Sequence, residues 1–134
     1  MINHLDLSVS DLTRSTEFYA SLLGSLGYRR VENDADGGPN WVLRAEGVLS
    51  SIGLHPASES TRHTGQSPGL HHLAFHAESR EQVDELYSLL LASAMRILDP
   101  PAEYDYSPGY YAVFFADPDG MKLEMVHEPV PWSE

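Results

Sequence analysis

Three side chains far apart in the sequence have the chemistry of divalent-metal ligands: His4, His72 and Glu124. Each lies in a short stretch where apolar and polar residues alternate, as in "HLDLSV" from His4. Because alternate side chains of a strand point to opposite faces, each of the three lies on the face opposite its apolar neighbours. Two imidazoles and one carboxylate form a metal site that leaves coordination positions open for water or substrate.

The strands that carry these residues belong to an internal repeat. A shift of 68 residues aligns the segment from His4 with the segment from His72, and in both the alternating stretch precedes a helical pattern. Asp11 and Ser79 are expected to cap the two helices. We therefore predict an α+β fold of two tandem βαβββ modules, whose strands form a curved, barrel-like mixed sheet with helices on the outer face. The metal ligands would meet in the concavity.

The 134 residues are expected to form one domain with two repeats, at about 1–57 and 69–129, joined by a polar loop at 58–68. Short strands separated by turn sequences such as "DPDG" at 117–120 follow each helix. Aligned on their final hairpins, the halves require a shift of 73, which places Ser51 opposite Glu124. The second half is then expected to have a longer loop within "DPPAEYDYSPG".

Composition narrows the classes of function. The chain has no cysteine, so disulfides, thiolate metal sites and cysteine nucleophiles are excluded. The net charge of −12 argues against nucleic acid and anionic membranes as partners and suits a cationic ligand. No stretch reads as a membrane span or a signal peptide, so we expect a cytoplasmic protein that acts on a small molecule.

The motifs "HLDLSVSDLTRSTEFYASLLG", "HHLAFHA" and "FFADPDGMKLEMVH" together resemble the vicinal oxygen chelate superfamily, which includes glyoxalase, extradiol dioxygenase and bleomycin-resistance proteins. The resemblance runs through about Glu128. It implies a homodimer and one divalent ion, Fe, Mn, Zn, Ni or Co, bound by His4, His72 and Glu124. Ser51 is a poor fourth ligand. His55 lies roughly 13 Å further along its strand, so we do not expect it to bind the same ion.

Candidates for a catalytic base are Tyr110, His76 and Tyr106. His76 shares the strand face of His72, although a solvated histidine at the sheet edge is an alternative interpretation. Tyr106 lies in the stretch that precedes the next strand, where loops near a site select substrates. Tyr110 and Tyr111 enter that strand on opposite faces, and parity leaves open which phenol faces the site.

The leading hypothesis is a metal-dependent glyoxalase- or dioxygenase-like enzyme, whose ion acts as a Lewis acid on a small substrate chelated through adjacent oxygens. The enzyme would be a lyase, isomerase, dioxygenase or thiol transferase. The alternative is a metal-free protein that sequesters a small molecule or antibiotic, as bleomycin-resistance proteins do. A third interpretation is purely structural, with His4 and His72 hydrogen-bonded to Glu124 without a metal.

Overall fold

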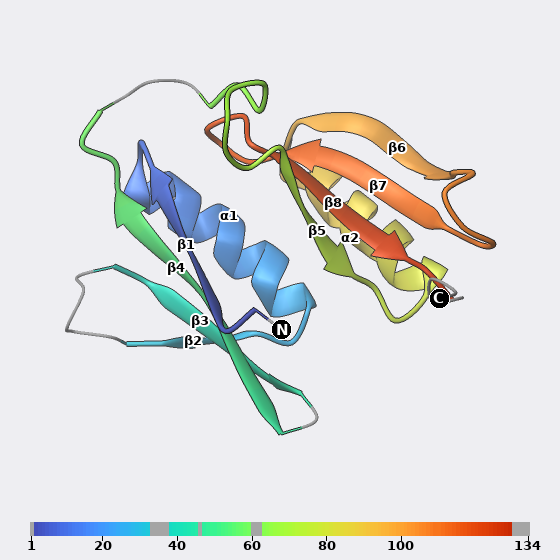
Figure 1. The fold of residues 1–134 in the computed structure, drawn as a ribbon, viewed down its shortest axis with the longest axis horizontal. Coiled ribbons are helices and arrows are strands. Elements are labelled where there is room, and N and C mark those ends of the chain that lie inside the picture. The colour runs from blue at the N-terminus through green and yellow to red at the C-terminus, as the bar shows by residue number, and fades with distance from the viewer. Residues whose placement is uncertain (1, 33–37, 46, 60–62, 130–134) are drawn as a thin grey trace. The chain divides into compact units, whose positions relative to one another are not determined.

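The computed structural model describes residues 2–32, 38–45, 47–59 and 63–129. The chain divides into two compact units, Met1–Thr61 and Arg62–Glu134. The elements of the first unit are β1 (His4–Val9), α1 (Leu12–Ser25), β2 (Arg29–Val31), β3 (Asn40–Ala45) and β4 (Val48–Pro56) (Figure 1). Those of the second are β5 (His72–His76), α2 (Arg80–Ala92), β6 (Ile97–Glu103), β7 (Tyr111–Ala116) and β8 (Lys122–His127).

Each unit is a βαβββ module, so the predicted α+β class and the tandem repeat are confirmed. The first sheet has the strand order β1-β4-β3-β2 and the second has the order β5-β8-β7-β6. In both sheets the first strand pairs in parallel with the last, and the remaining pairs are antiparallel. Among the described helices, none is long and apolar enough to span a membrane.

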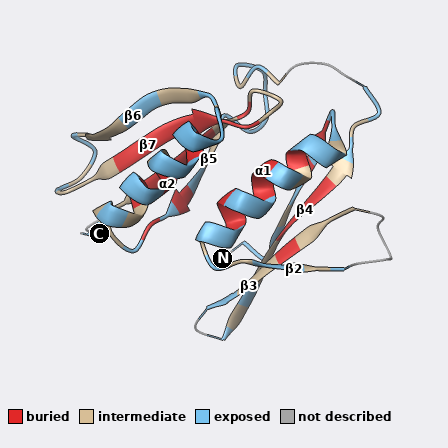
Figure 2. Cartoon of the chain, turned by 180° about the vertical axis from the view of Figure 1, so that it is seen from behind, coloured by how far each residue is buried: buried red, intermediate tan, exposed pale blue. Residues whose placement is uncertain are grey.

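The helices begin where the sequence predicts. Asp11 accepts a hydrogen bond from the Arg14 backbone N–H at 3.0 Å, and Ser79 accepts one from the Gln82 backbone N–H at 3.2 Å. Such caps satisfy amide groups that the first helical turn leaves unpaired. One stripe of each helix is buried and the opposite stripe is exposed, as Figure 2 shows. Each helix therefore covers one face of its own sheet with apolar side chains.

The two faces of the second sheet differ in chemistry. Val113 and Phe115 of β7 lie opposite Met125 and Leu123 of β8, and all four are fully buried. They share the parity of a face that packs on α2. The other face carries Glu124 in a mainly apolar setting, where Ala112, Phe114 and Val126 form a buried cluster flanked by Leu98, Tyr104 and Tyr110.

Strand β6 includes the first part of the stretch in which the longer loop is expected. It continues through Pro100 and Pro101 to Glu103, and the connection to β7 begins only at Tyr104. Proline lacks the N–H that a central strand must donate, but β6 is an edge strand, and its pairing with β7 shifts register on both sides of Asp99. Edge position and register shifts are the settings in which a sheet tolerates proline.

Strand register also corrects the correspondence between Ser51 and Glu124. His4 pairs with Ser51, whereas His72 pairs with Lys122, and Glu124 lies two rows further along, opposite Ala74. The position in β4 that corresponds to Glu124 is therefore Gly53, which lies opposite Asp6. A shift of two residues keeps the same sheet face, so the hairpin alignment had the correct parity and the wrong row.

Candidate metal centre

Glu124 is the centre of the polar site in the second unit. It is a buried carboxylate, 2 % exposed, in the middle of β8. Its Oε2 lies 3.4 Å from Nε2 of His72, and its Oε1 accepts a hydrogen bond from the Tyr110 hydroxyl. Burial of a charge is costly unless it is paired and hydrogen-bonded, and here each carboxylate oxygen has its own partner.

Tyr110 acts on this carboxylate as a hydrogen-bond donor. Burial, and then the hydrogen bond to Glu124, raise the pKa of Tyr110 well above its ordinary value. The phenol therefore stays protonated at neutral pH and keeps Oε1 of Glu124 engaged. This leaves Oε2 as the oxygen that faces His72.

His71 contacts the ring of His72. Their Nδ1 atoms are 2.7 Å apart, so one of the two donates to the other. If His72 donates, its Nε2 has a free lone pair that points at the Glu124 carboxylate, an arrangement that a cation between them would stabilise. If His71 donates, Nε2–H of His72 can donate to Glu124 without a metal. His71 is itself exposed, so its contact with His72 lies at the surface.

The other candidates of the second unit lie around this carboxylate or beyond it. Tyr106 is 62 % exposed; its ring packs edge-on against Tyr110 at a centroid distance of 5.1 Å and stacks on Tyr104. His76 ends β5 as an exposed residue. Tyr111 faces the helix, because its hydroxyl donates to Asp84 of α2 at 2.8 Å. Of the two adjacent tyrosines, Tyr110 is therefore the one on the Glu124 face.

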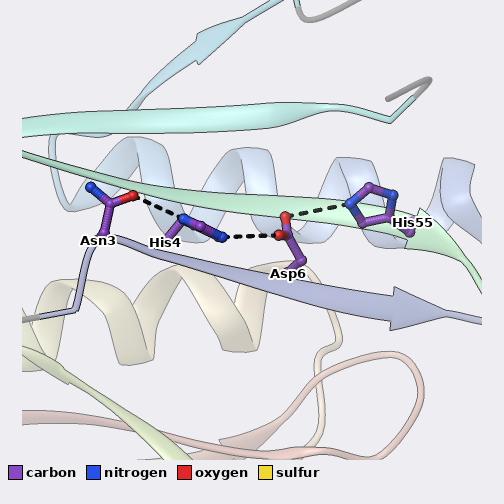
Figure 3. Close-up of polar contacts among 4 residues, drawn as sticks. All are labelled: Asn3, His4, Asp6 and His55. Atoms are coloured by element: carbon purple, nitrogen blue, oxygen red, sulfur yellow. Dashed lines mark hydrogen bonds and ion pairs between the residues drawn. The ribbon is translucent and has the colours of Figure 1, made fainter. Parts of the chain in front are cut away.

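His4 belongs to a row of polar side chains on the first sheet. Figure 3 shows the Asp6 carboxylate between two imidazoles, with His4 Nε2 3.8 Å from Oδ2 and His55 Nε2 3.4 Å from Oδ1. Nδ1 of His4 donates to the side-chain oxygen of Asn3 at 2.9 Å. His4, Asp6 and Ser8 are exposed while Leu7 and Val9 are buried, as the alternating pattern predicts.

The distance between the nitrogen and oxygen donors of a pair can be compared with the distance between two ligands of one divalent ion. Nitrogen and oxygen ligands at about 2.0–2.2 Å from one ion lie roughly 3.0–3.4 Å from each other, and the 3.4 Å between His72 and Glu124 is at the upper end of that span. Within the residues that the structure describes, no three His, Asp or Glu side chains form a ready-made metal cluster. Two predicted ligands are thus brought together in the second unit, and the third, His4, lies in the first unit.

Sequence reasoning missed Asp6, although a usable signal was present. Asp6 shares strand parity with His4, two residues away, so the alternating pattern already places an imidazole and a carboxylate on the same face of β1. The role of His55 required the register of β1 with β4, which places it opposite Ser8, two rows beyond Asp6 and on the same face.

Comparison with known proteins identifies the family to which these two βαβββ modules belong. The profile of the Glyoxalase/Bleomycin resistance protein/Dioxygenase superfamily matches residues 1–125. The chain belongs to this superfamily.

Individual relatives cover nearly the whole chain. The uncharacterized protein YqjT of Bacillus subtilis is 37 % identical over 93 % of this chain and 97 % of its own length. The metallothiol transferase FosB of Lysinibacillus sphaericus is 29 % identical over 92 % and 79 %, respectively. The crystal structure of a candidate glyoxalase from Bacillus halodurans superposes with a TM-score of 0.76 at 32 % identity, covering 96 % of both chains.

Proposed function

We propose that this protein is a divalent-metal-dependent enzyme that acts on a small substrate chelated through two adjacent oxygens. His4, His72 and Glu124 would hold the ion. The observation that carries the proposal is the buried Glu124 carboxylate with the His72 imidazole 3.4 Å away, since a nitrogen and an oxygen donor at this distance can bind one divalent ion. Superfamily membership and the similarity to a metallothiol transferase support it.

The ion, when bound, would act as a Lewis acid on the chelated oxygens of the substrate; Fe, Mn, Zn, Ni and Co all accept this ligand set. The chain's own residues would orient the site. Tyr110 would keep one oxygen of Glu124 engaged, so that the other faces the ion, and His71 would fix the tautomer of His72. His76 and Tyr106 remain candidates for the catalytic base.

The proposal includes a homodimer, as the resemblance implies, and a location in the cytoplasm. His4 would join His72 and Glu124 either within one chain or from a partner chain. If light scattering shows that the protein is a monomer at the working concentration, a metal site shared between two chains is excluded.

Turnover by the metal-loaded protein tests the proposed function. Chelator-stripped protein is reconstituted with each of the five metals and given an α-dicarbonyl with a thiol, an epoxide with a thiol, a catechol, or a chiral α-hydroxy ketone. We expect turnover of one class, lost on chelation and restored by the metal. No turnover with any metal, together with tight binding of a cationic glycopeptide by the metal-free protein, would favour sequestration, which the net charge of −12 also suits.

A further inference from the structure

We propose that Asp6 is an additional ligand of the metal ion, paired with His4 as Glu124 is paired with His72. This inference rests on the proposed metal site and adds a carboxylate to it. The proposed ligands would then be two imidazoles and two carboxylates. Such a set of nitrogen and oxygen donors suits Fe(II), Mn(II), Ni(II), Co(II) or Zn(II).

Strand register shows that each module pairs a carboxylate with a small residue across its first and last strands, with the two residue types on opposite strands in the two modules. In the second module Ala74 of β5 lies opposite Glu124 of β8. At the corresponding row of the first module Asp6 of β1 lies opposite Gly53 of β4. The carboxylate is thus on the last strand of the second module and on the first strand of the first module. The small residue is on the opposite member of each strand pair. Each module keeps one carboxylate and one small neighbour in this row.

Gly53 provides the space that Asp6 uses. A Cβ atom at position 53 would lie 2.3 Å from Oδ1 of Asp6, far inside contact distance, and 3.4 Å from Nδ2 of Asn40. The Asp6 carboxylate therefore occupies the place where a side chain corresponding to Glu124 would begin. A side chain at position 53 would displace the Asp6 carboxylate from this place.

The two carboxylates also have the same pattern of partners. Oε1 of Glu124 accepts from Tyr110 and its Oε2 faces Nε2 of His72. Because a carboxylate cannot donate, Nε2–H of His55 is the donor to Oδ1 of Asp6, which leaves Oδ2 facing Nε2 of His4. In each module one oxygen has a hydrogen-bond donor and the other oxygen points at the imidazole predicted to bind metal.

The contact between His4 and Asn3 suits the tautomer that a metal ligand needs. The side-chain oxygen of Asn3 can only accept, so Nδ1 of His4 carries the proton. In the neutral ring Nε2 then has a lone pair, and it faces Oδ2 of Asp6 at 3.8 Å. Two electron-rich atoms face each other here, which favours a cation between them. Bringing them onto one ion requires a closure of a few tenths of an ångström.

A swap of the two residue types tests the assignment. Asp6→Asn is expected to weaken binding of Mn(II) or Zn(II) to the chelator-stripped full chain about 100-fold, measured by calorimetric titration, because loss even of an outer partner costs 10–100-fold. The double variant Asp6→Ala with Gly53→Glu rebuilds the Ala74/Glu124 arrangement in the first module and should bind within about 10-fold of the wild type. Glu85→Gln, which removes the same charge from the exposed side of α2, is the control.

The outcomes separate this inference from the proposed function. Wild-type affinity in Asp6→Asn would overturn the role of Asp6 and leave the site of His4, His72 and Glu124 intact. Absence of metal binding in the wild type would overturn both. Asp6 is exposed, so a melting temperature close to that of the wild type is expected for Asp6→Asn. If the double variant does not fold, the metal affinity of Asp6→Asn alone decides the test.

Discussion

Glu124→Gln is expected to lower the affinity for divalent metal by more than about 100-fold, because loss even of a group that only hydrogen-bonds to a ligand costs 10–100-fold and Glu124 is a direct ligand in the proposed site. The fold should survive. The amide oxygen can still accept the hydrogen bond from Tyr110, and the substitution removes a buried charge. The free energy of unfolding of the metal-free protein should change by no more than about 1–2 kcal/mol.

Two titrations decide between a metal ligand and a structural carboxylate. Metal affinity is measured by calorimetry, and stability is measured by urea unfolding of the metal-free protein. Glu103→Gln is the matched control, since Glu103 is an exposed carboxylate whose partner is Arg80 on the surface. If Glu124→Gln is strongly destabilised while its metal affinity equals that of the wild type, Glu124 and His72 form a structural pair and the assignment is wrong.

Phe115→Ala is expected to destabilise the second unit by about 3–5 kcal/mol, the usual cost of truncating a buried phenylalanine. Phe115 is fully buried on the face of β7 that packs on α2. This is a large part of the roughly 5–15 kcal/mol that stabilises a typical domain. Denaturant unfolding monitored by circular dichroism gives the difference.

Leu91→Ala is the control for this core position. Leu91 is in the last turn of α2 and is 55 % exposed, so its truncation should change stability by less than about 0.5 kcal/mol. Equal, small losses in both variants would contradict the placement of Phe115 in the core between α2 and its sheet.

The elements of the fold follow from patterns that local physics fixes. Alternation places Leu7 and Val9 inside and His4 outside, and the caps at Asp11 and Ser79 mark where the helices begin. The internal repeat then predicts that the second module has the same elements as the first. These features depend on side-chain periodicity and backbone capping, which a sequence displays directly.

The register of each strand against its neighbour cannot be predicted from local patterns, because it depends on packing between distant segments. A shift of two residues preserves every face, so alternation cannot separate Ser51 from Gly53 as the counterpart of Glu124. For the same reason the Asp6 and His55 contact was not predicted. The choice between Tyr110 and Tyr111 likewise required the register of β7, which places the Tyr111 hydroxyl at Asp84.

The most direct test of the metal site is metal content by plasma mass spectrometry, on wild type, His4→Ala and His72→Ala purified without chelator or a nickel column. The proposed site predicts about one divalent ion per chain in the wild type and almost none in either variant, because each removes a ligand of the same ion. One ion retained in His4→Ala would show that the two modules do not share it. No ion in the wild type, even after reconstitution with Fe(II), Mn(II) and Zn(II), would contradict metal-dependent catalysis.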